Sequence, residues 1–405
     1  KEFTFTVNLK DQANLALNVE YAYTIKKGED KVSEGKVKDA ETILLKDGET
    51  ATITGLPAGT RYTVTETPAA GYTPDAAEKS GSVTAEQTAK ADFTNTYSVE
   101  GSLNGNTALK VVKKFTGREN DQWLESDKFT FTLSAADKAT QDAADAGFIT
   151  LPETTELTID STMEEKQAAF GNIKFSIEGT FKFNVTEQVS GIAGVTDDKK
   201  PIREIVVGVA DNQDGTLKAT VEDGSDNLVF VNTYGAETDE SEDIAARIPA
   251  TKKLTGRDMD SEEFSFEVVT RAAEGKNAAG ADGEAAKVAF AGSDANGAKA
   301  LNYTTESLNE AVAAGYATKS EKETGDIVWT VNYTAREKMD SLPKGVTPAE
   351  GKTAFDFTIV IADNNDGTLT AEVQTPEGGI AFENNYATGG TEVNTDPTET
   401  AVYFN

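Results

Sequence analysis

KVVKKFTGR (110–118) returns as PATKKLTGR (249–257), and this repetition decides how the chain is organised. Each copy precedes an alternating stretch, FTFTL (129–133) after the first and FSFEV (264–268) after the second. The chain opens on a third such stretch, FTFTV (3–7), which has no Lys-Lys-x-Thr-Gly-Arg before it. Self-similarity in a fixed order indicates units that are repeated along the chain.

Further matches keep the same order and set the boundaries of the repeats. They are YTVTE (62–66), FKFNVTE (181–187) and WTVNYTARE (329–337); IVVGVADNQDGTL (205–217) and FTIVIADNNDGTL (357–369); and a closing F-x-N-x-Y at 93–97, 230–234 and 382–386. Short joints that contain Gly and Asn or acidic residues separate the copies. We therefore expect three modules, at 1–97, 98–235 and 236–387, and a tail at 388–405 that is a linker or the start of a further module.

Inside the modules, aromatic or β-branched residues alternate with polar ones, which is the period of half-buried strands. The Asp-Gly pairs at 214–215 and 366–367, and KDG (46–48), are typical of hairpin turns. Helical patterning is confined to short insertions such as 307–317, and we expect the Ala- and Gly-rich stretch 271–300 to be a loop or an irregular insertion. The predicted fold class is all-β, with three tandem immunoglobulin-like β-sandwiches and short helical insertions.

Composition excludes several classes of function. A chain of 405 residues with a formal net charge of −31 repels phosphate backbones and anionic lipids, so we expect no nucleic acid and no membrane among its partners. It contains no Cys and no His, which excludes thiol nucleophiles, imidazole bases and the common zinc sites. We expect no metal and no cofactor. No apolar run could span a bilayer, and without a leader or a sorting signal we expect a piece of a longer exported protein.

Strand parity places polar side chains on faces that are otherwise apolar. In the first strand of the second module, Lys113 shares its face with Val111 and Phe115, whereas Lys114 points outward. Later strands place one Glu and one Asn in the same way. The residues concerned are Lys113, Glu187 and Asn232 in the second module, and Lys252, Glu337 and Asn384 in the third.

Two interpretations of these residues remain open at this point. One is an ion pair between Lys and Glu at strand ends, with Asn capping a turn. The other is covalent chemistry, because burial lowers the pKa of a lysine and raises that of a glutamate until both are neutral. The amine then attacks the Asn side-chain carbonyl, Glu moves the protons, and ammonia leaves. The product would be a Lys–Asn isopeptide bond, formed once in a water-poor core.

The ordered set of motifs resembles a known family. KKFTGR, FTFTL, FKFNVTE, DGTL and FVNTY in the second module, and their counterparts in the third, are similar to the streptococcal-pilin isopeptide-linkage domains of Gram-positive surface proteins. The first module, with ATITGLPAGTRYTVTETPAAGYT (51–73), resembles the related collagen-adhesin B-type domains. The likeness extends over nearly the whole chain.

The resemblance implies cross-link sites at particular residues. In such domains a Lys of the first strand is joined to an Asn of the last strand with the help of a Glu. Carried over, this gives Lys113–Asn232 with Glu187 as the catalytic residue, and Lys252–Asn384 with Glu337. The first module has the Glu (Glu66) and the Asn (Asn95), but its lysine-bearing strand would lie upstream, so we expect no bond within 1–97.

The resemblance also implies a function. It is that of a stalk segment in a pilus-like adhesin, secreted and anchored to the cell wall by a sortase, with its surface ligand bound by parts outside this chain. We expect a monomeric spacer and not an enzyme that acts on an external substrate. The alternative is an adhesive module that binds a host or partner glycan or protein through the insertion at 271–326. A polymerising pilin subunit is a third candidate, and it would need an accessible intermolecular Lys and a processed C-terminal Thr.

Overall fold

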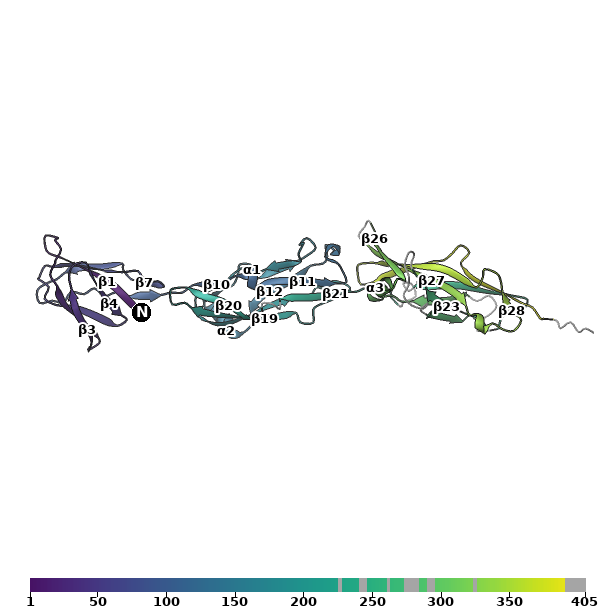
Figure 1. The fold of residues 1–405 in the computed structure, drawn as a ribbon, viewed down its shortest axis with the longest axis horizontal. Helices are drawn as coiled ribbons and strands as arrows, with labels where there is room; N and C mark the ends of the chain where they lie inside the picture. Colours follow the sequence, from purple (N-terminus) through teal and green to yellow (C-terminus); the bar gives the residue numbers. More distant parts are fainter. Residues whose placement is uncertain are drawn as a thin grey trace, which may run out of the picture.

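The computed structural model describes residues 1–224, 228–239, 246–260, 263–272, 284–289, 296–322 and 326–389. In these ranges the chain is mainly β-structure, so the expected all-β fold class is confirmed. Figure 1 shows three β-rich bodies that follow one another along the long axis of the molecule. We refer to residues 1–97, 98–235 and 236–387 as units one, two and three.

Unit one has nine strands in three sheets. They are β1 (Glu2–Lys10), β2 (Tyr21–Lys27), β3 (Asp30–Val37), β4 (Glu41–Lys46), β5 (Glu49–Ile53), β6 (Arg61–Glu66), β7 (Tyr72–Pro74), β8 (Glu78–Ser82) and β9 (Asn95–Tyr97). The sheet orders are β4-β1-β6-β8, β3-β2-β5 and β7-β9. The expected hairpin at 46–48 is wrong, because this turn joins β4 to β5 and these strands belong to different sheets.

Unit two also builds three sheets, with the orders β10-β16-β13, β15-β11-β21-β18 and β14-β12-β17-β19-β20. Its elements are β10 (Gly101–Leu103), α1 (Gly105–Ala108), β11 (Lys110–Thr116), the 3-10 turn η1 (Asn120–Gln122), β12 (Phe129–Ala135), α2 (Lys138–Asp145), β13 (Ile149–Thr150), β14 (Glu156–Ile159), β15 (Gln167–Ala169), β16 (Ile173–Phe175), β17 (Gly179–Glu187), β18 (Val195–Thr196), β19 (Ile202–Asp211), β20 (Leu217–Asp223) and β21 (Val229–Tyr234). Asp137 caps α2 by accepting a hydrogen bond from the Thr140 N–H.

The described strands of unit three form two sheets that correspond to the two larger sheets of unit two. Their orders are β25-β22-β31-β28 and β24-β23-β27-β29-β30, with β26 paired to β27. Its elements are β22 (Ala246–Thr255), β23 (Ser265–Thr270), β24 (Glu284–Ala289), β25 (Asn296–Leu301), α3 (Thr305–Ala314), β26 (Ala317–Glu321), β27 (Ile327–Glu337), the 3-10 turn η3 (Met339–Ser341), β28 (Val346–Pro348), β29 (Ala354–Asp363), β30 (Leu369–Gln374) and β31 (Ile380–Tyr386). The expected helix within 307–317 is confirmed by α3, which begins at a Thr304–Ser307 capping box and ends at Gly315 in the left-handed region.

The Ala- and Gly-rich stretch differs from the expectation of a loop. Within 271–300 the chain forms β24, which pairs with β23, and β25, which pairs with the first strand β22 of the unit. Residues 273–283 and 290–295 lie outside the described residues, and so does most of the tail at 388–405. The alternative that 271–326 binds a ligand therefore falls largely on a part of the chain that the structure does not describe.

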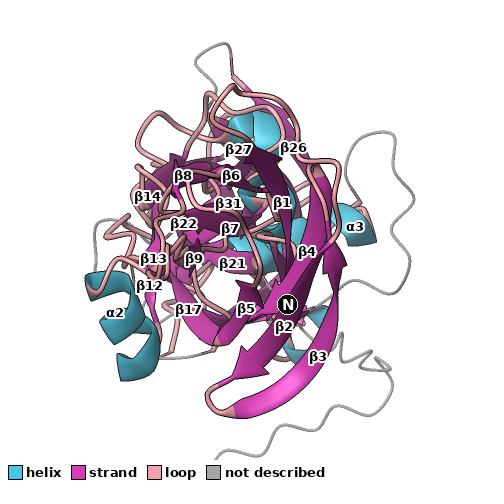
Figure 2. Ribbon diagram, turned by 90° about the vertical axis from the view of Figure 1, so that its left-hand side faces the viewer, coloured by secondary structure: helices cyan, strands magenta, loops and turns pink. Residues whose placement is uncertain are grey.

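The cores follow from the alternation in the sequence. Along β17, Phe181, Phe183 and Val185 are buried, and the residues between them are only partly buried. One cluster of buried apolar side chains runs through units two and three, whereas unit one has its own, around Val7 and Leu9. In the end-on view, α2 and α3 lie at the periphery of the strands (Figure 2). None of the described helices has the length and the apolar character that crossing a bilayer requires.

Candidate functional site

The strand β11, which carries Lys113, and the last strand of unit two, β21, lie side by side in parallel. Their register pairs Lys113 with Phe230 and Phe115 with Asn232. Because Lys113 is two residues from Phe115, its side chain lies on the face of the sheet that Asn232 also occupies. On the facing sheet, Glu187 ends β17 opposite Phe131 of β12, whose ring contacts that of Phe230 at 5.0 Å between centroids.

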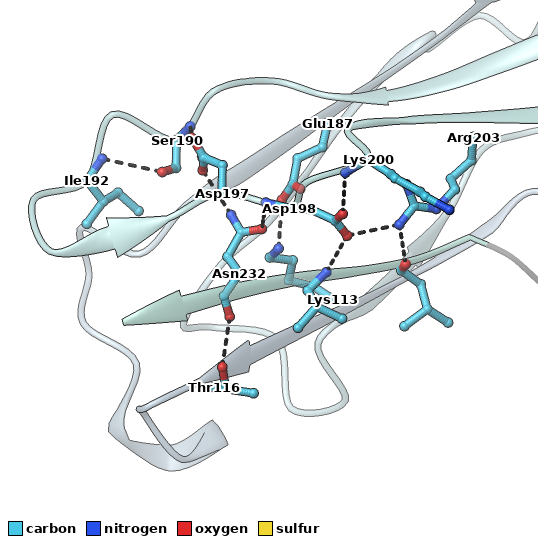
Figure 3. A network of polar contacts seen from close by, with 12 residues as sticks. Lys113, Thr116, Glu187, Ser190, Ile192, Asp197, Asp198, Lys200, Arg203 and Asn232 are labelled. Atoms are coloured by element: carbon cyan, nitrogen blue, oxygen red, sulfur yellow. Dashed lines mark hydrogen bonds and ion pairs between the residues drawn. The ribbon is translucent and has the colours of Figure 1, made fainter. Parts of the chain in front are cut away.

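Lys113 and Glu187 meet in the interior between these sheets (Figure 3). Lys113 Nζ lies 2.7 Å from Glu187 Oε1 and 4.4 Å from the centroid of the Phe129 ring. The two residues are only 3% and 4% exposed. Burial lowers the pKa of Lys113 and raises that of Glu187, although their mutual attraction opposes both shifts. Both shifts favour a neutral amine facing a neutral acid.

Asn232 is fully buried beside this pair, and two aspartates hold its amide. The Asp198 backbone N–H donates to Asn232 Oδ1 at 2.9 Å, and Asn232 Nδ2 donates to Asp197 Oδ1 at 3.1 Å. Burial opposes ionisation of Asp198, but backbone N–H groups of Val231 and Lys200 and the Arg203 guanidinium hold its pKa below the usual value. The Asn232 carbonyl is thereby polarised and fixed in direction (Figure 3).

Asp197 offers a test of this arrangement within the chain itself. We expect Asp197→Ala to slow any reaction at Asn232 by up to about tenfold, since one hydrogen bond that orients the amide is lost. The same reaction at Asn384 should keep its rate, because no equivalent aspartate contacts that residue among the described residues. A mass time course after cell-free synthesis measures both rates. Equal slowing in both units would contradict a local role for Asp197.

Unit three brings the corresponding residues together in a different arrangement. The parallel pairing of β22 with β31 aligns Lys252 with Phe382 and Leu254 with Asn384. Glu337 Oε1 accepts hydrogen bonds from Lys252 Nζ and, at 3.0 Å, from Asn384 Nδ2, so one carboxyl group touches both partners. All three residues are at most 4% exposed, and burial lowers the pKa of Lys252 against the attraction of Glu337. Lys252 Nζ also lies 4.4 Å from the centroid of the Phe264 ring.

Unit one holds only part of the site. Asn95 Nδ2 donates to Glu66 Oε1 at 2.6 Å, and Glu66 is 4% exposed. The strand that carries Asn95, β9, pairs with β7 alone, whereas β21 pairs with both β18 and the lysine-bearing strand β11. Glu66 Oε2 and Asn95 Oδ1 are buried without a hydrogen-bond partner among the described residues. Among the described residues, no lysine is hydrogen-bonded to or ion-paired with either side chain, and a lysine-bearing strand upstream stays a prediction.

The structure thus brings each predicted set together, and it adds two residues. Asp197 and Asp198 were not singled out by the sequence, where they stand in an acidic and basic run, DDKK (197–200), that reads as a solvated loop. Their position two residues past β18, which pairs with β21, places them against Asn232. That placement depends on the pairing of strands remote in sequence, so local pattern could not reveal it.

Models of two known families match stretches of this chain. Residues 109–235 and 248–387 each match the model of a family described as the Spy0128-like isopeptide containing domain. Residues 1–97 match a family described as a domain of unknown function (DUF7601). The likeness of unit one to collagen-adhesin B-type domains stays a prediction.

Individual relatives point to pili. A stretch of 72 residues is 40% identical to the pilus tip adhesin Cpa of Streptococcus pyogenes; it makes up 18% of this chain and 10% of that protein, so the chain spans about a tenth of the relative. Among solved structures, the major pilin T-13 of Streptococcus pyogenes is 14% identical, covering 71% of this chain and 99% of the pilin, with a TM-score of 0.22. The major pilin SpaA of Corynebacterium diphtheriae is 9% identical, covering 94% and 100%, with a TM-score of 0.23. Scores this low carry no argument about fold or function.

Proposed function

Because the chain belongs to the Spy0128-like isopeptide containing domain family, through residues 109–235 and 248–387, we propose that units two and three each close one isopeptide bond. The bonds join Lys113 to Asn232 and Lys252 to Asn384. The observation that carries this proposal is the burial of an amine, a carboxyl group and an amide in mutual contact around Glu337, with Lys252 and Asn384 both hydrogen-bonded to one oxygen.

The proposed reaction needs no external reagent. The neutral lysine Nζ attacks the Asn side-chain carbon, the new C–N bond forms, and the bond from that carbon to Nδ2 breaks. The neutral Glu carboxyl group gives its proton to the departing nitrogen, which leaves as ammonia, and takes one amine proton in return. Atoms and charge balance, because an amine and an amide give a new amide and ammonia. Glu337 suits this exchange because its Oε1 already contacts both nitrogens.

The protein around the reacting groups also lowers the activation barrier. Because the fold holds these groups next to one another in a buried core, they react as if each were present at a very high concentration. In unit two the Asp198 N–H, 2.9 Å from Asn232 Oδ1, points at the atom on which negative charge grows. Each reaction runs once per chain, and we propose no turnover of an external substrate.

The biological role that we propose is that of a load-bearing stalk segment of a surface adhesin or pilus-like protein, outside the cell and attached to the wall. Each bond would join a strand near the N-terminal end of its unit to the last strand of the same unit, β11 to β21 and β22 to β31. A pull on the termini then passes through covalent bonds and bypasses the sheet hydrogen bonds. The stretch that is 40% identical to the pilus tip adhesin Cpa supports this role, and its ligand would be bound elsewhere in the full-length protein.

We expect the intact, denatured chain to be lighter than its sequence mass by two ammonia molecules. Peptide mapping should find Lys113 linked to Asn232 and Lys252 linked to Asn384, with Asn95 unmodified. Unit one serves as the internal control, because Glu66 and Asn95 are hydrogen-bonded there and, among the described residues, no lysine is bonded to either of them. A chain at full sequence mass would contradict the proposed function, and a loss of three ammonia molecules would contradict the incomplete site in unit one.

A further inference from the structure

A tyrosine closes each unit, and the first two of these tyrosines lie at the boundary to the following unit. The Tyr97 hydroxyl of unit one donates to the Asp211 carboxylate of unit two, at 2.9 Å from Oδ1. The Tyr234 hydroxyl of unit two donates to Asp363 Oδ1 of unit three at 2.6 Å. Tyr234 is buried, and burial together with this hydrogen bond raises its pKa to about 12. The two boundaries therefore use the same contact.

The receiving aspartates open turns of one shape. The turns are Asp211-Asn-Gln-Asp-Gly-Thr216 and Asp363-Asn-Asn-Asp-Gly-Thr368, between β19 and β20 and between β29 and β30. In both, the backbone N–H two residues on donates to the first aspartate, at 2.6 Å from Gln213 and 2.8 Å from Asn365. Those two residues have nearly the same positive φ, 62° and 63°. The hydrogen bonds within each turn thus hold the aspartate carboxylate in place, independently of the tyrosine that donates to it.

The backbones at the two boundaries also match. The Gly71 and Gly194 backbones approach those of Gly215 and Gly367 so closely that a Cβ on the first of each pair would lie within 2.8 Å of the second. Three residues after each tyrosine, a glutamate backbone forms a parallel bridge to the threonine of the turn. The bridges are Glu100 to Thr216 and Glu237 to Thr368. The linker itself is therefore part of the junction.

The far end of unit three carries the same tyrosine side of this junction. The Ala387 N–H donates to Gly345 O at 3.0 Å, as the Gly235 N–H donates to Gly194 O at 2.9 Å. The Arg257 guanidinium lies over the Tyr386 ring at 4.9 Å. Tyr386 is partly exposed, and among the described residues its hydroxyl has no hydrogen-bond partner.

The arginine repeats as well. At the second boundary, Arg118 lies over the Tyr234 ring at 4.0 Å, pairs with Asp127, and donates to Asn365 of the turn in unit three. At the end of unit three, Arg257 pairs with Glu263 in the corresponding place. The end of unit three thus carries a partly exposed phenol and guanidinium, groups that bind carboxylates through hydrogen bonds.

We propose that the Tyr386 end of unit three is a docking surface for a further β-sandwich unit of the same polypeptide, one that presents an Asp-x-x-Asp-Gly-Thr turn. Attachment within the same polypeptide follows from the linker bridges, which require the docked unit to continue from the residues just after the tyrosine. Residue 389, three positions after Tyr386, is a glycine, and the bridge uses only backbone groups. The inference concerns unit-to-unit docking and does not depend on isopeptide chemistry.

The test joins Ala387 directly to a second copy of residues 99–235, so that the copy's own Asp211 turn can reach Tyr386. The chain has no Cys, so two introduced cysteines carry spin labels without background. Labels at Ser341→Cys and at Lys138→Cys of the added copy lie on either side of the new junction. Pulsed electron–electron double resonance measures the distribution of distances between them. We expect a single narrow distance distribution.

Two variants decide whether the contact itself holds the units. Tyr386→Phe, or Asp211→Asn in the added copy, should lower the docked population by about tenfold and broaden the distribution. Thermal unfolding of each protein verifies that the added copy is folded. A broad distribution in the unsubstituted extension would overturn the proposal, and so would a narrow one that neither variant changes. Self-association of the unextended chain, lost in Tyr386→Phe on sedimentation, would replace docking in the same polypeptide by docking of a second copy.

Discussion

Replacing Glu337 by Ala should abolish the Lys252–Asn384 bond and leave the Lys113–Asn232 bond intact. Glu337 is the only group among the described residues that contacts both reacting nitrogens, so its loss removes the route for both protons. General acid–base catalysis contributes about 10²–10⁴-fold to such steps. After correction for the substitution, the intact mass should show the loss of one ammonia and not two.

Matched variants separate chemistry from packing. Glu337→Gln keeps the size and a hydrogen-bonding oxygen but cannot exchange protons, so we expect it to block the bond as Ala does. Glu187→Ala should block the other bond and spare this one, and Glu204→Ala, at an exposed pair with Lys182, should spare both. Loss of two ammonia molecules from both Glu337 variants would rule out the proposed role of this carboxyl group.

Much of the site could be predicted because strand parity is a strong constraint. Alternation along a strand fixes the face on which each side chain lies. The second and third modules show the same pattern of charged residues on an apolar face, so each supports the other. Lys113 and Lys252 are accordingly buried, while their neighbours Lys114 and Lys253 are exposed. The choice between an ion pair and a covalent bond depended on the resemblance to a family, because both place the same residues in the same interior.

What parity could not reach is set by pairing between distant strands. Asp197 and Asp198 contact Asn232 only because β18 lies beside β21, and no local pattern marks them. The turn at 46–48 has the composition of a hairpin turn, but the two strands that it connects, β4 and β5, belong to different sheets. The strand β25 was hidden in a stretch rich in Ala and Gly, where β propensity is low and pairing with β22 decides.

The repeat also concealed a difference between the units. From the sequence, Glu187 and Glu337 have equal roles. In the structure, Glu337 contacts both Lys252 and Asn384. Asn232 instead accepts a hydrogen bond from the Asp198 N–H and donates one to Asp197, while Glu187 contacts Lys113. Unit two thus divides between two acidic groups what unit three assigns to one, which is why Asp197 is expected to matter in unit two alone.

The cost of losing the bond should depend strongly on which partner is removed. Asn232→Ala and Lys113→Ala both prevent the Lys113–Asn232 bond, which closes a loop of more than a hundred residues. By analogy with disulfides, losing that constraint lowers the free energy of unfolding by about 4–5 kcal/mol. Asn232→Ala leaves the contact between Lys113 and Glu187 in place. Lys113→Ala in addition leaves the Glu187 carboxyl group buried without its partner, which costs about 3–5 kcal/mol more once that group is ionised.

The extra loss in Lys113→Ala should depend on pH. Burial already raises the pKa of Glu187 above its ordinary value of 4.5, and without Lys113 nothing nearby opposes the shift. A carboxyl group whose folded pKa lies above its unfolded pKa is most favourable when protonated, so its penalty is absent below about pH 4.5 and grows as the pH rises toward the folded pKa. We therefore expect the deficit in stability of Lys113→Ala relative to Asn232→Ala, measured as the difference between their denaturant midpoints, to grow from pH 4 to pH 7.

Hydrogen exchange measured by mass spectrometry gives the stability of unit two separately, through peptides of β17 and β21. Lys114→Ala is the control, because this neighbour is exposed and should leave both the bond and the stability unchanged. If Lys113→Ala and Asn232→Ala remained equally stable from pH 4 to pH 7, Glu187 would not be a buried acid held by Lys113. Since the same burial makes Lys113 a nucleophile, the chemistry proposed for unit two would then lose its physical basis.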